Sequence, residues 1–312
     1  MYSHDKYYRC LQSVLKILRK MNLYNVKGIK GALYRFFSKI ANFRYKPLSK
    51  EKMKELKNGT NHLIISLTTY GSRTNRVHMT LDSLFLQTVK PEKVILWLSE
   101  DEYTGKLDEL SKEIVERVEN IKWFEVRFCE DLKPHKKYFE TMRAYPDATV
   151  VTVDDDVFYP SDWLEELVNL SDNNPGCICC TTAHYMTTDS LGNIKSYSDW
   201  IHSTDEIGPS LFLCPIGVGG VLYPPHCLYE DVFDKDFIVE NCLKADDLWL
   251  KIMSLLKNTM VVRGSRYSYT FLSVQGSEKD GLSLVNVLQN KNDEQLNCIM
   301  RKYGDSVKEM LT

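Results

Sequence analysis

The segment Val150-Val-Thr-Val-Asp-Asp-Asp-Val-Phe-Tyr-Pro160 joins an apolar run to three consecutive carboxylates. Residues 149–153 are all β-branched, which predicts a fully buried strand. Asp154, Asp155 and Asp156 follow at its C-terminal end, where open α/β sheets bind ligands. Three like charges resist burial, and Mg²⁺ or Mn²⁺ removes that cost by sharing carboxylates with substrate phosphate oxygens. A solvated acidic turn is the alternative, which the preceding buried strand disfavours.

Three further apolar strands are expected before this segment, and each is followed by a helix. The strands cover residues 62–69, 93–98 and 123–129, and the helices cover residues 74–87, 105–119 and 135–144. This alternation predicts a parallel sheet, because parallel neighbours need a crossover connection that is usually helical. The expected fold class is therefore α/β, a mostly parallel Rossmann-like sheet with helices on both faces.

The pattern is looser after the acidic segment. The run Pro215-Ile-Gly-Val-Gly-Gly-Val-Leu-Tyr-Pro-Pro225 interleaves glycine with apolar residues, so its backbone can approach a ligand closely. A later helix carries Asp246 and Asp247 in its first turn. The expected elements are a helix at 163–170, a strand near 177–182, loops at 185–214, a helix at 244–257, a strand at 259–263, a polar loop at 273–281 and a helix at 292–303.

The start of the chain is strongly basic. Residues 1–50 contain twelve Lys or Arg and a single acid, Asp5, whereas residues 51–312 contain 28 basic and 41 acidic residues. Apolar residues at helical spacing between positions 5 and 45 predict amphipathic helices with basic residues between them. We therefore expect a basic helical extension over residues 1–57 ahead of a main domain over residues 58–312, with a linker around 46–60.

Two interpretations of this extension stay open. Helices that combine apolar and basic residues lie in an anionic membrane interface, which makes residues 5–45 a candidate membrane-binding segment. Alternatively, the apolar side, with Leu11, Leu15 and Met21, packs on the main domain. No nucleic-acid partner is expected, because the remaining surface is acidic and no recognition motif is present.

The cysteines and the hydropathy indicate the cellular location of the protein. There are nine cysteines, an odd number, with several in apolar runs and no CxxC pair, which favours reduced thiols. No apolar run approaches the ~18 residues of a spanning helix, and no signal-peptide pattern is seen. We expect a cytoplasmic protein, peripheral on the inner face of the cell membrane if the extension binds lipid.

Several features together resemble the GT-A-fold glycosyltransferases, most closely the bacterial family-2-like enzymes that build surface glycans. The resemblance spans about residues 60–270 and rests on the parallel half-sheet and on the segments Ser66–Tyr70, Thr80–Pro91, Asp154–Asp156, Gly217–Gly220 and Ala245–Trp249. The family's usual Glu-Asp pair is Asp246-Asp247 here, and the first loop, Tyr70-Gly-Ser-Arg73, differs from the common Pro-x-Tyr-Asn. These departures affect the expected stereochemical outcome of sugar transfer more than the expected fold.

The resemblance implies a transferase that moves a sugar from a nucleotide-sugar donor, by family habit a UDP-hexose, to a glycan or lipid-linked glycan acceptor in capsule or lipopolysaccharide synthesis. Such transfer needs a cation at the departing diphosphate and, for inversion, a base on the acceptor hydroxyl. By analogy, Asp156 and Asp154 would bind Mn²⁺ or Mg²⁺. Asp247 is the candidate base and Asp246 would orient the acceptor or the base, although both could instead serve the helix N-terminus.

The donor would contact residues from several segments. The candidates for nucleotide-sugar binding are Thr68, Thr69, Tyr70, Arg73, Lys137, Asp154, Asp155, Gly219 and Gly220. The residues near position 70 would hydrogen-bond or stack on a uracil, and the two glycines would floor the sugar or acceptor pocket. Further residues could contact the donor or a sugar ring, but could also be ordinary surface or core residues. These are Lys136, Trp200, His202, Arg263 and Arg266.

Other functions are weighed against this one. A nucleotidyltransferase would use the acidic triplet for two metals and release pyrophosphate from a nucleoside triphosphate. That reading leaves the glycine-rich run and Asp246-Asp247 unexplained. A retaining glycosyltransferase on the same fold stays open, and so does a noncatalytic scaffold, which the intact carboxylates disfavour.

Overall fold

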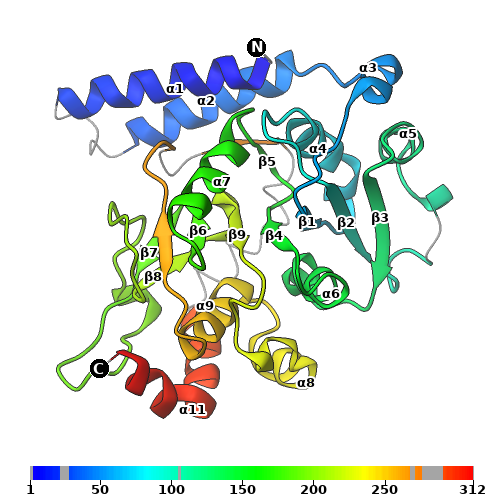
Figure 1. Cartoon of the computed structure of the whole chain (residues 1–312). Coiled ribbons are helices and arrows are strands. Elements are labelled where there is room, and N and C mark those ends of the chain that lie inside the picture. Colours follow the sequence, from blue (N-terminus) through cyan, green and yellow to red (C-terminus); the bar gives the residue numbers. More distant parts are fainter. Residues whose placement is uncertain (1–2, 22–27, 105–106, 268–270, 276–290, 312) are drawn as a thin grey trace.

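The computed structural model describes residues 3–21, 28–104, 107–267, 271–275 and 291–311. The chain forms an α/β fold around one seven-stranded sheet, with helices packed on both faces (Figure 1). From residue 276 onward, the polar loop expected at 273–281 lies outside the described residues.

The main sheet is mostly parallel, as the sequence predicts. Its order is β10-β6-β9-β4-β1-β2-β3. β4, β1, β2 and β3 run parallel, and so do β6 and β10, whereas β9 is antiparallel to both of its neighbours. The strands are β1 (Leu63–Thr68), β2 (Lys93–Ser99), β3 (Phe124–Cys129), β4 (Thr149–Thr152), β6 (Ile178–Cys180), β9 (Val221–Tyr223) and β10 (Val261–Arg263).

Two small sheets flank the main one. Strand β5 (Val157–Phe158), directly after the acidic triplet, pairs with β11 (Leu272–Ser273). Strand β7 (Ala183–Tyr185) pairs with β8 (Leu213–Pro215) at the two ends of the region 185–214, which was expected to be loops. Strand β9 was not expected either, because it is only three residues long and lies between glycines and prolines.

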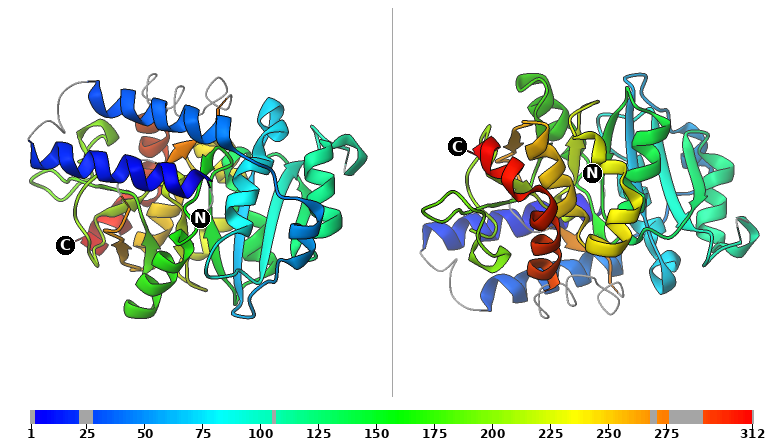
Figure 2. Two further views of the ribbon diagram at one scale, coloured as in Figure 1. Left: turned by 90° about the horizontal axis from the view of Figure 1, so that it is seen from above. Right: turned by 90° about the horizontal axis from the view of Figure 1, so that it is seen from below.

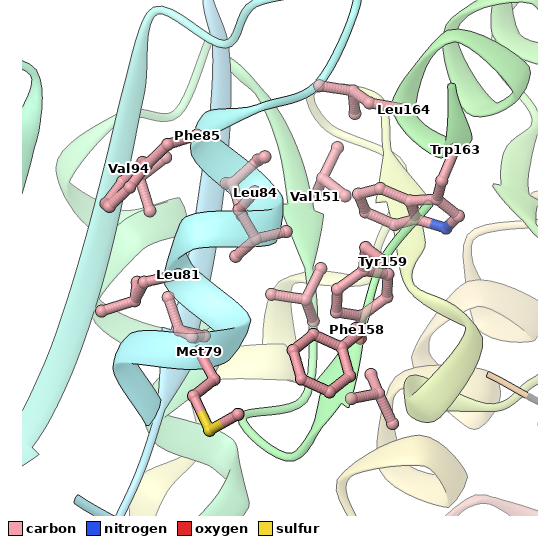
Figure 3. Close-up of a cluster of buried hydrophobic side chains, with 14 of the residues drawn as sticks. Met79, Leu81, Leu84, Phe85, Val94, Val151, Phe158, Tyr159, Trp163 and Leu164 are labelled. Atoms are coloured by element: carbon pink, nitrogen blue, oxygen red, sulfur yellow. The ribbon is translucent and has the colours of Figure 1, made fainter. Parts of the chain in front are cut away.

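Apolar residues alternate along the strands and so build a core on each face. In β1, Leu63, Ile65 and Leu67 enter one core, while Ile64 enters a cluster on the other face. Figure 3 shows part of the first core, where Phe85 and Leu84 of helix α4 lie close to strand residues. Fully burying a side chain of this kind contributes about 1.5–3 kcal/mol. The helices are α4 (Val77–Phe85), α5 (Lys112–Asn120), α6 (Phe139–Ala144), α7 (Trp163–Asn173), α8 (Lys235–Phe237), α9 (Asp246–Leu256) and α11 (Lys291–Leu311).

The basic extension is helical, as expected, and packs on the main domain. Helices α1 (Ser3–Lys20) and α2 (Ile29–Arg44) lie side by side across one end of the molecule (Figures 1 and 2). Tyr8, Leu11 and Leu15 of α1 are buried in the same core as the central strands. The expected linker is partly wrong, because it contains helix α3 (Lys50–Glu55), capped by the side chain of Ser49. Within the described ranges, no helix has both the length and the apolar character needed to cross a bilayer.

Candidate functional site

The acidic triplet lies in a loop at the C-terminal end of β4, beside the end of β1. These strands pair in parallel, so the segments 69–73 and 154–156 leave the sheet at the same edge. Thr69 donates a hydrogen bond from Oγ1 to Oδ2 of Asp155 at 2.5 Å, and Thr80 donates to the Asp155 carbonyl at 2.8 Å. The triplet is therefore anchored to the first strand and to helix α4, at the edge where such sheets bind ligands.

Arg73 neutralises part of this charge. Its Nη2 atom lies 2.5 Å from Oδ1 of Asp155 and 2.6 Å from Oδ2 of Asp156, and its guanidinium stacks 5.5 Å from the centre of the Tyr70 ring. Burial and the Asp155 carboxylate still raise the pKa of Asp156 to about 7, against the opposing effect of Arg73. The loop therefore holds more negative charge than Arg73 balances, which favours a further cation.

Lys137 is the second cation of the site. It ends the 3₁₀ turn before α6, and its Nζ lies 3.1 Å from Oδ1 of Asp154 and 2.7 Å from Oδ2 of Asp246. Burial alone would lower the pKa of Lys137, but the two carboxylates hold it well above the ordinary value. Lys136 and Lys137 are both buried, so neither belongs to an exposed basic surface. Lys136 pairs instead with Asp131.

Asp246 and Asp247 begin helix α9 but differ in environment. Lys137 overcomes the effect of burial and keeps the pKa of Asp246 below its ordinary value. Asp247 accepts hydrogen bonds from the Gly217 N–H at 3.2 and 3.1 Å. Burial, followed by the Asp246 and Asp154 charges, raises the pKa of Asp247 to about 7. Two adjacent carboxyls with separated pKa values can take different acid–base roles near neutral pH.

Gly217 is the point where these groups meet. A β-carbon added there would lie 2.7 Å from Nζ of Lys137, 3.1 Å from Oδ1 of Asp247 and 3.3 Å from Oδ1 of Asp154. The triplet and the α9 carboxylates therefore share one small region, although strands β5 to β9 and helices α7 and α8 separate Asp154 from Asp247 along the chain. Only glycine leaves that region open.

Gly219 and Gly220, the expected pocket floor, make room for the protein's own side chains. A β-carbon on Gly219 would lie 2.6 Å from Oγ1 of Thr182, and one on Gly220 would lie 2.1 Å from the Trp163 ring. Trp163 also donates from Nε1 to the Gly219 carbonyl at 2.8 Å. The expected role is corrected accordingly: these two glycines pack the core, and Gly217 is the glycine beside the charged groups.

Tyr159 is a site residue that the sequence reasoning missed. Its hydroxyl accepts a hydrogen bond from the Asp154 N–H at 3.0 Å and donates one to the Val218 carbonyl at 3.3 Å. Its ring packs on the Trp163 ring (Figure 3), and the ring centroids are 4.4 Å apart. Tyr159 thus ties the acidic loop to the glycine-rich run. Its place at the end of the motif Asp-Asp-Asp-Val-Phe-Tyr was the available signal.

The segment that includes strand β11 is hydrogen-bonded to the acidic loop. The Val274 N–H donates to the Asp156 carbonyl at 2.7 Å. Asn42 of α2 accepts from the Gln275 N–H at 2.9 Å and donates to the Ser273 carbonyl at 2.8 Å. Helix α2 is therefore joined to the acidic loop through one short strand.

Several other sequence candidates have structural partners of their own. Thr68 donates from Oγ1 to the Trp97 carbonyl at 2.9 Å. Arg263 is buried and donates to three backbone carbonyls, those of Asp205, Glu206 and Gly264. These contacts hold neighbouring loops in place and give Arg263 a structural role.

The remaining candidates also have partners outside the triplet and the Asp246-Asp247 pair. Arg266 pairs with Asp162, the residue before α7. Trp200 is buried and donates from Nε1 to the Lys195 carbonyl at 3.0 Å, which supports its reading as a core residue. His202 is exposed and lies against the Tyr197 ring, with centroids 5.0 Å apart.

The carboxylates of Asp154 and Asp156 suit a cation that is also bound by phosphate. They do not suit a metal ion whose ligands all come from the protein. In the part of the chain that the structure describes, no group of three or more His, Cys, Asp or Glu residues could hold a metal ion. A phosphate-bound Mg²⁺ needs only one or two protein carboxylates, because phosphate oxygens and water complete its shell. The side chains of Asp154 and Asp156 are 33% and 28% exposed, so both can reach such a ligand.

No protein-family model matches this chain, and no curated protein matches it. The chemistry of the charged cluster is therefore the basis on which a function can be argued, since a fold alone does not imply one.

Proposed function

We propose that this chain is a metal-dependent glycosyltransferase of the GT-A type. The observation that carries the proposal is the convergence of Asp154, Lys137 and Asp247 on Gly217. A cation-binding carboxylate and a carboxyl with a pKa near 7 then lie within one small region, as sugar transfer from a nucleotide-sugar donor requires. The position at the carboxyl ends of parallel strands supports a nucleotide ligand.

On the donor side, Asp156 and Asp154 would hold Mn²⁺ or Mg²⁺ together with the diphosphate. When bound, the ion would neutralise the charge that develops on the leaving group. Tyr70 and Thr69, at the end of β1, would contact the nucleoside, and Arg73 would orient the acidic loop through its two ion pairs.

On the acceptor side, Asp247 would take the proton from the attacking hydroxyl. The Gly217 N–H fixes the orientation of this carboxylate, and the raised pKa makes it a stronger base than an ordinary aspartate. Asp246 is already held by Lys137 and would position Asp247 without exchanging protons itself. This arrangement favours inversion, with a glycan or lipid-linked glycan of bacterial surface polysaccharide as the acceptor class.

A donor panel tests the proposal. Purified protein would be incubated with UDP- and GDP-sugars, with Mn²⁺ or with chelator, and release of free nucleoside diphosphate would be measured. We expect release with at least one donor, abolition by chelator, and at least ~100-fold loss in Asp247→Asn when an acceptor is present, the scale of lost general-base catalysis. Asp147→Asn, at an 89% exposed side chain, is the matched control and should be unaffected.

Two results would overturn the proposal. Turnover that is insensitive to chelator would remove the metal role of Asp156 and Asp154. Pyrophosphate release from a nucleoside triphosphate, with no cleavage of any nucleotide sugar, would identify a nucleotidyltransferase instead.

A further inference from the structure

The outer side of the α1–α2 hairpin leaves large apolar side chains in water. Phe36 and Phe43 of α2 are 57% and 82% exposed, and seven residues place them on one side of the helix. Ile17 of α1 and the adjoining Met21 are 55% and 59% exposed. Isolated exposed apolar residues are ordinary, but four on one hairpin indicate a surface that contacts something.

The same surface is basic. Lys16 and Lys20 of α1, and Arg35 and Lys39 of α2, are exposed beside these apolar residues. The one acid of the first fifty residues, Asp5, is 2% exposed and accepts a hydrogen bond from the Ser161 N–H at 2.8 Å. Its charge is thus directed into the main domain, and the outer face of the hairpin carries positive charge alone.

We propose that the outer face of α1 and α2 docks on an anionic lipid bilayer. Exposed phenylalanines enter the boundary between headgroups and acyl chains, while lysines and arginines are attracted to anionic headgroups. A second copy of the chain is a poorer occupant, because two faces of the same positive charge repel each other. Nucleic acid would match the charge but would leave the aliphatic residues Ile17 and Met21 without a partner.

The hairpin is held rigidly by its inner side, so docking requires no unfolding. Tyr8 stacks on Phe271 with ring centroids 5.8 Å apart, and Arg9 pairs with Asp162 at 2.9 Å. Since Leu11 and Leu15 are already in the core, only the outer residues remain for lipid. Binding is therefore mainly electrostatic, with a few aromatic anchors, and should weaken as salt rises.

Vesicle co-sedimentation of the full chain tests this directly. The probes are phosphatidylcholine vesicles with and without 30% phosphatidylglycerol, at about 0.1 M and 0.5 M salt. We expect binding to the anionic vesicles only, and loss at high salt. Lys16→Glu with Lys20→Glu should weaken partitioning at least ~25-fold, from about fivefold per neutralised charge. Phe36→Ser with Phe43→Ser should also weaken binding to the anionic vesicles, but should change its salt dependence less than the lysine substitutions do.

Matched controls carry the same substitutions away from the hairpin. Lys112→Glu with Lys122→Glu changes two exposed lysines at α5, and Leu191→Ser removes a 69% exposed leucine. Neither should alter binding. Circular dichroism would establish that each variant is folded.

Four outcomes would overturn the inference. These are no sedimentation with anionic vesicles, equal binding to both vesicle types, hairpin variants that bind like the control variants, and vesicle binding replaced by tight binding to single-stranded or duplex nucleic acid. None of these readouts depends on catalysis, so the proposed glycosyltransferase activity can fail while the membrane inference stands, and the reverse.

Discussion

Lys137 and Asp246 form a buried ion pair, with 2.7 Å between Nζ and Oδ2, that links the turn before α6 to the first residue of α9. Because Lys137 also reaches Asp154, this one ammonium group balances charge from both halves of the site. Asp247 is left as the carboxyl that titrates near neutral pH. The pairing therefore decides which member of the Asp246-Asp247 pair is available for proton transfer.

Removing Lys137 should strongly destabilise the fold. Lys137→Met leaves the buried Asp246 without its counter-ion, and breaking a buried pair in this way costs about 3–5 kcal/mol. Urea unfolding followed by circular dichroism measures the loss. Lys137→Met combined with Asp246→Leu should recover most of it, because no unpaired charge then remains at position 246. If the double variant were as unstable as the single one, the ion pair would not be the cause.

Asp247→Asn should stabilise the protein at alkaline pH while removing activity. Since the folded-state pKa of about 7 exceeds the ordinary 3.8, ionising Asp247 costs folding free energy, and this cost grows as pH rises from about 4 and is complete above about 7. The asparagine variant avoids it. A gain on the order of 1 kcal/mol corresponds to roughly 2 °C in Tm for a chain of this size.

The pH dependence separates this effect from ordinary repacking. At pH 8 the Tm of Asp247→Asn should exceed that of the native chain, and the difference should shrink as pH falls and nearly vanish at about pH 4 and below, where Asp247 is protonated in the folded chain and largely protonated in the unfolded chain as well. Any transferase activity of the native chain should fall as pH drops below about 7. A Tm difference of equal size at both pH values would contradict the assignment of the raised pKa.

Gly217 and Gly220 should respond differently to alanine. In Gly217→Ala the new β-carbon meets only the ends of the flexible Lys137, Asp247 and Asp154 side chains, so we expect a folded protein with at least ~10-fold lower activity, from misplaced catalytic groups. In Gly220→Ala the carbon would meet the buried Trp163 ring at 2.1 Å, with a backbone φ of 75°. That variant should lose stability or fail to fold. Thermal melts combined with donor-turnover assays distinguish the two, and the reverse pattern would refute the placement of Gly217 in the site.

Tyr159→Phe tests the link between the acidic loop and the glycine-rich run. It removes the hydroxyl that accepts a hydrogen bond from the partly buried Asp154 N–H, at a cost of about 1 kcal/mol. We expect a lower Tm and weaker divalent-cation binding with packing on Trp163 unchanged. Tyr303→Phe, which removes a hydroxyl that donates to Asp231 far from the triplet, is the matched control and should leave cation binding intact.

Thermal shift with Mn²⁺ and UDP reports on the acidic loop without any acceptor. A ligand that binds only the folded state increases the free energy of unfolding by mass action, by about 2.7 kcal/mol at a concentration of 100 times its Kd, and so raises the Tm. The native chain should show a shift that requires both ligands, and Asp156→Asn should lose most of it. Asp147→Asn should behave like the native chain. A full shift in Asp156→Asn would place the cation elsewhere.

Much of the parallel half of the fold was predictable from the sequence. The β-branched run before Asp154 and the alternation of strand and helix periods predict β1 to β4 and their helices, because these patterns record which side of an element is buried. Asp246 and Asp247 were correctly expected in the first turn of α9. Strand β9 was not predicted, since three apolar residues among glycines and prolines have no readable period.

The sequence by itself indicated the charged residues of the candidate site, whereas the tertiary structure decided how they pair and that Gly217, not Gly219 or Gly220, lies beside them. Lys137 contacts Asp154 and Asp246, and Arg73 contacts Asp155 and Asp156, through distances that depend on strand register and loop closure. Local periodicity carries no information on such long-range distances. Electrostatic energy falls with separation and burial, so only the folded arrangement makes Asp246 an ion-pair partner and its neighbour Asp247 a carboxyl that titrates near neutrality.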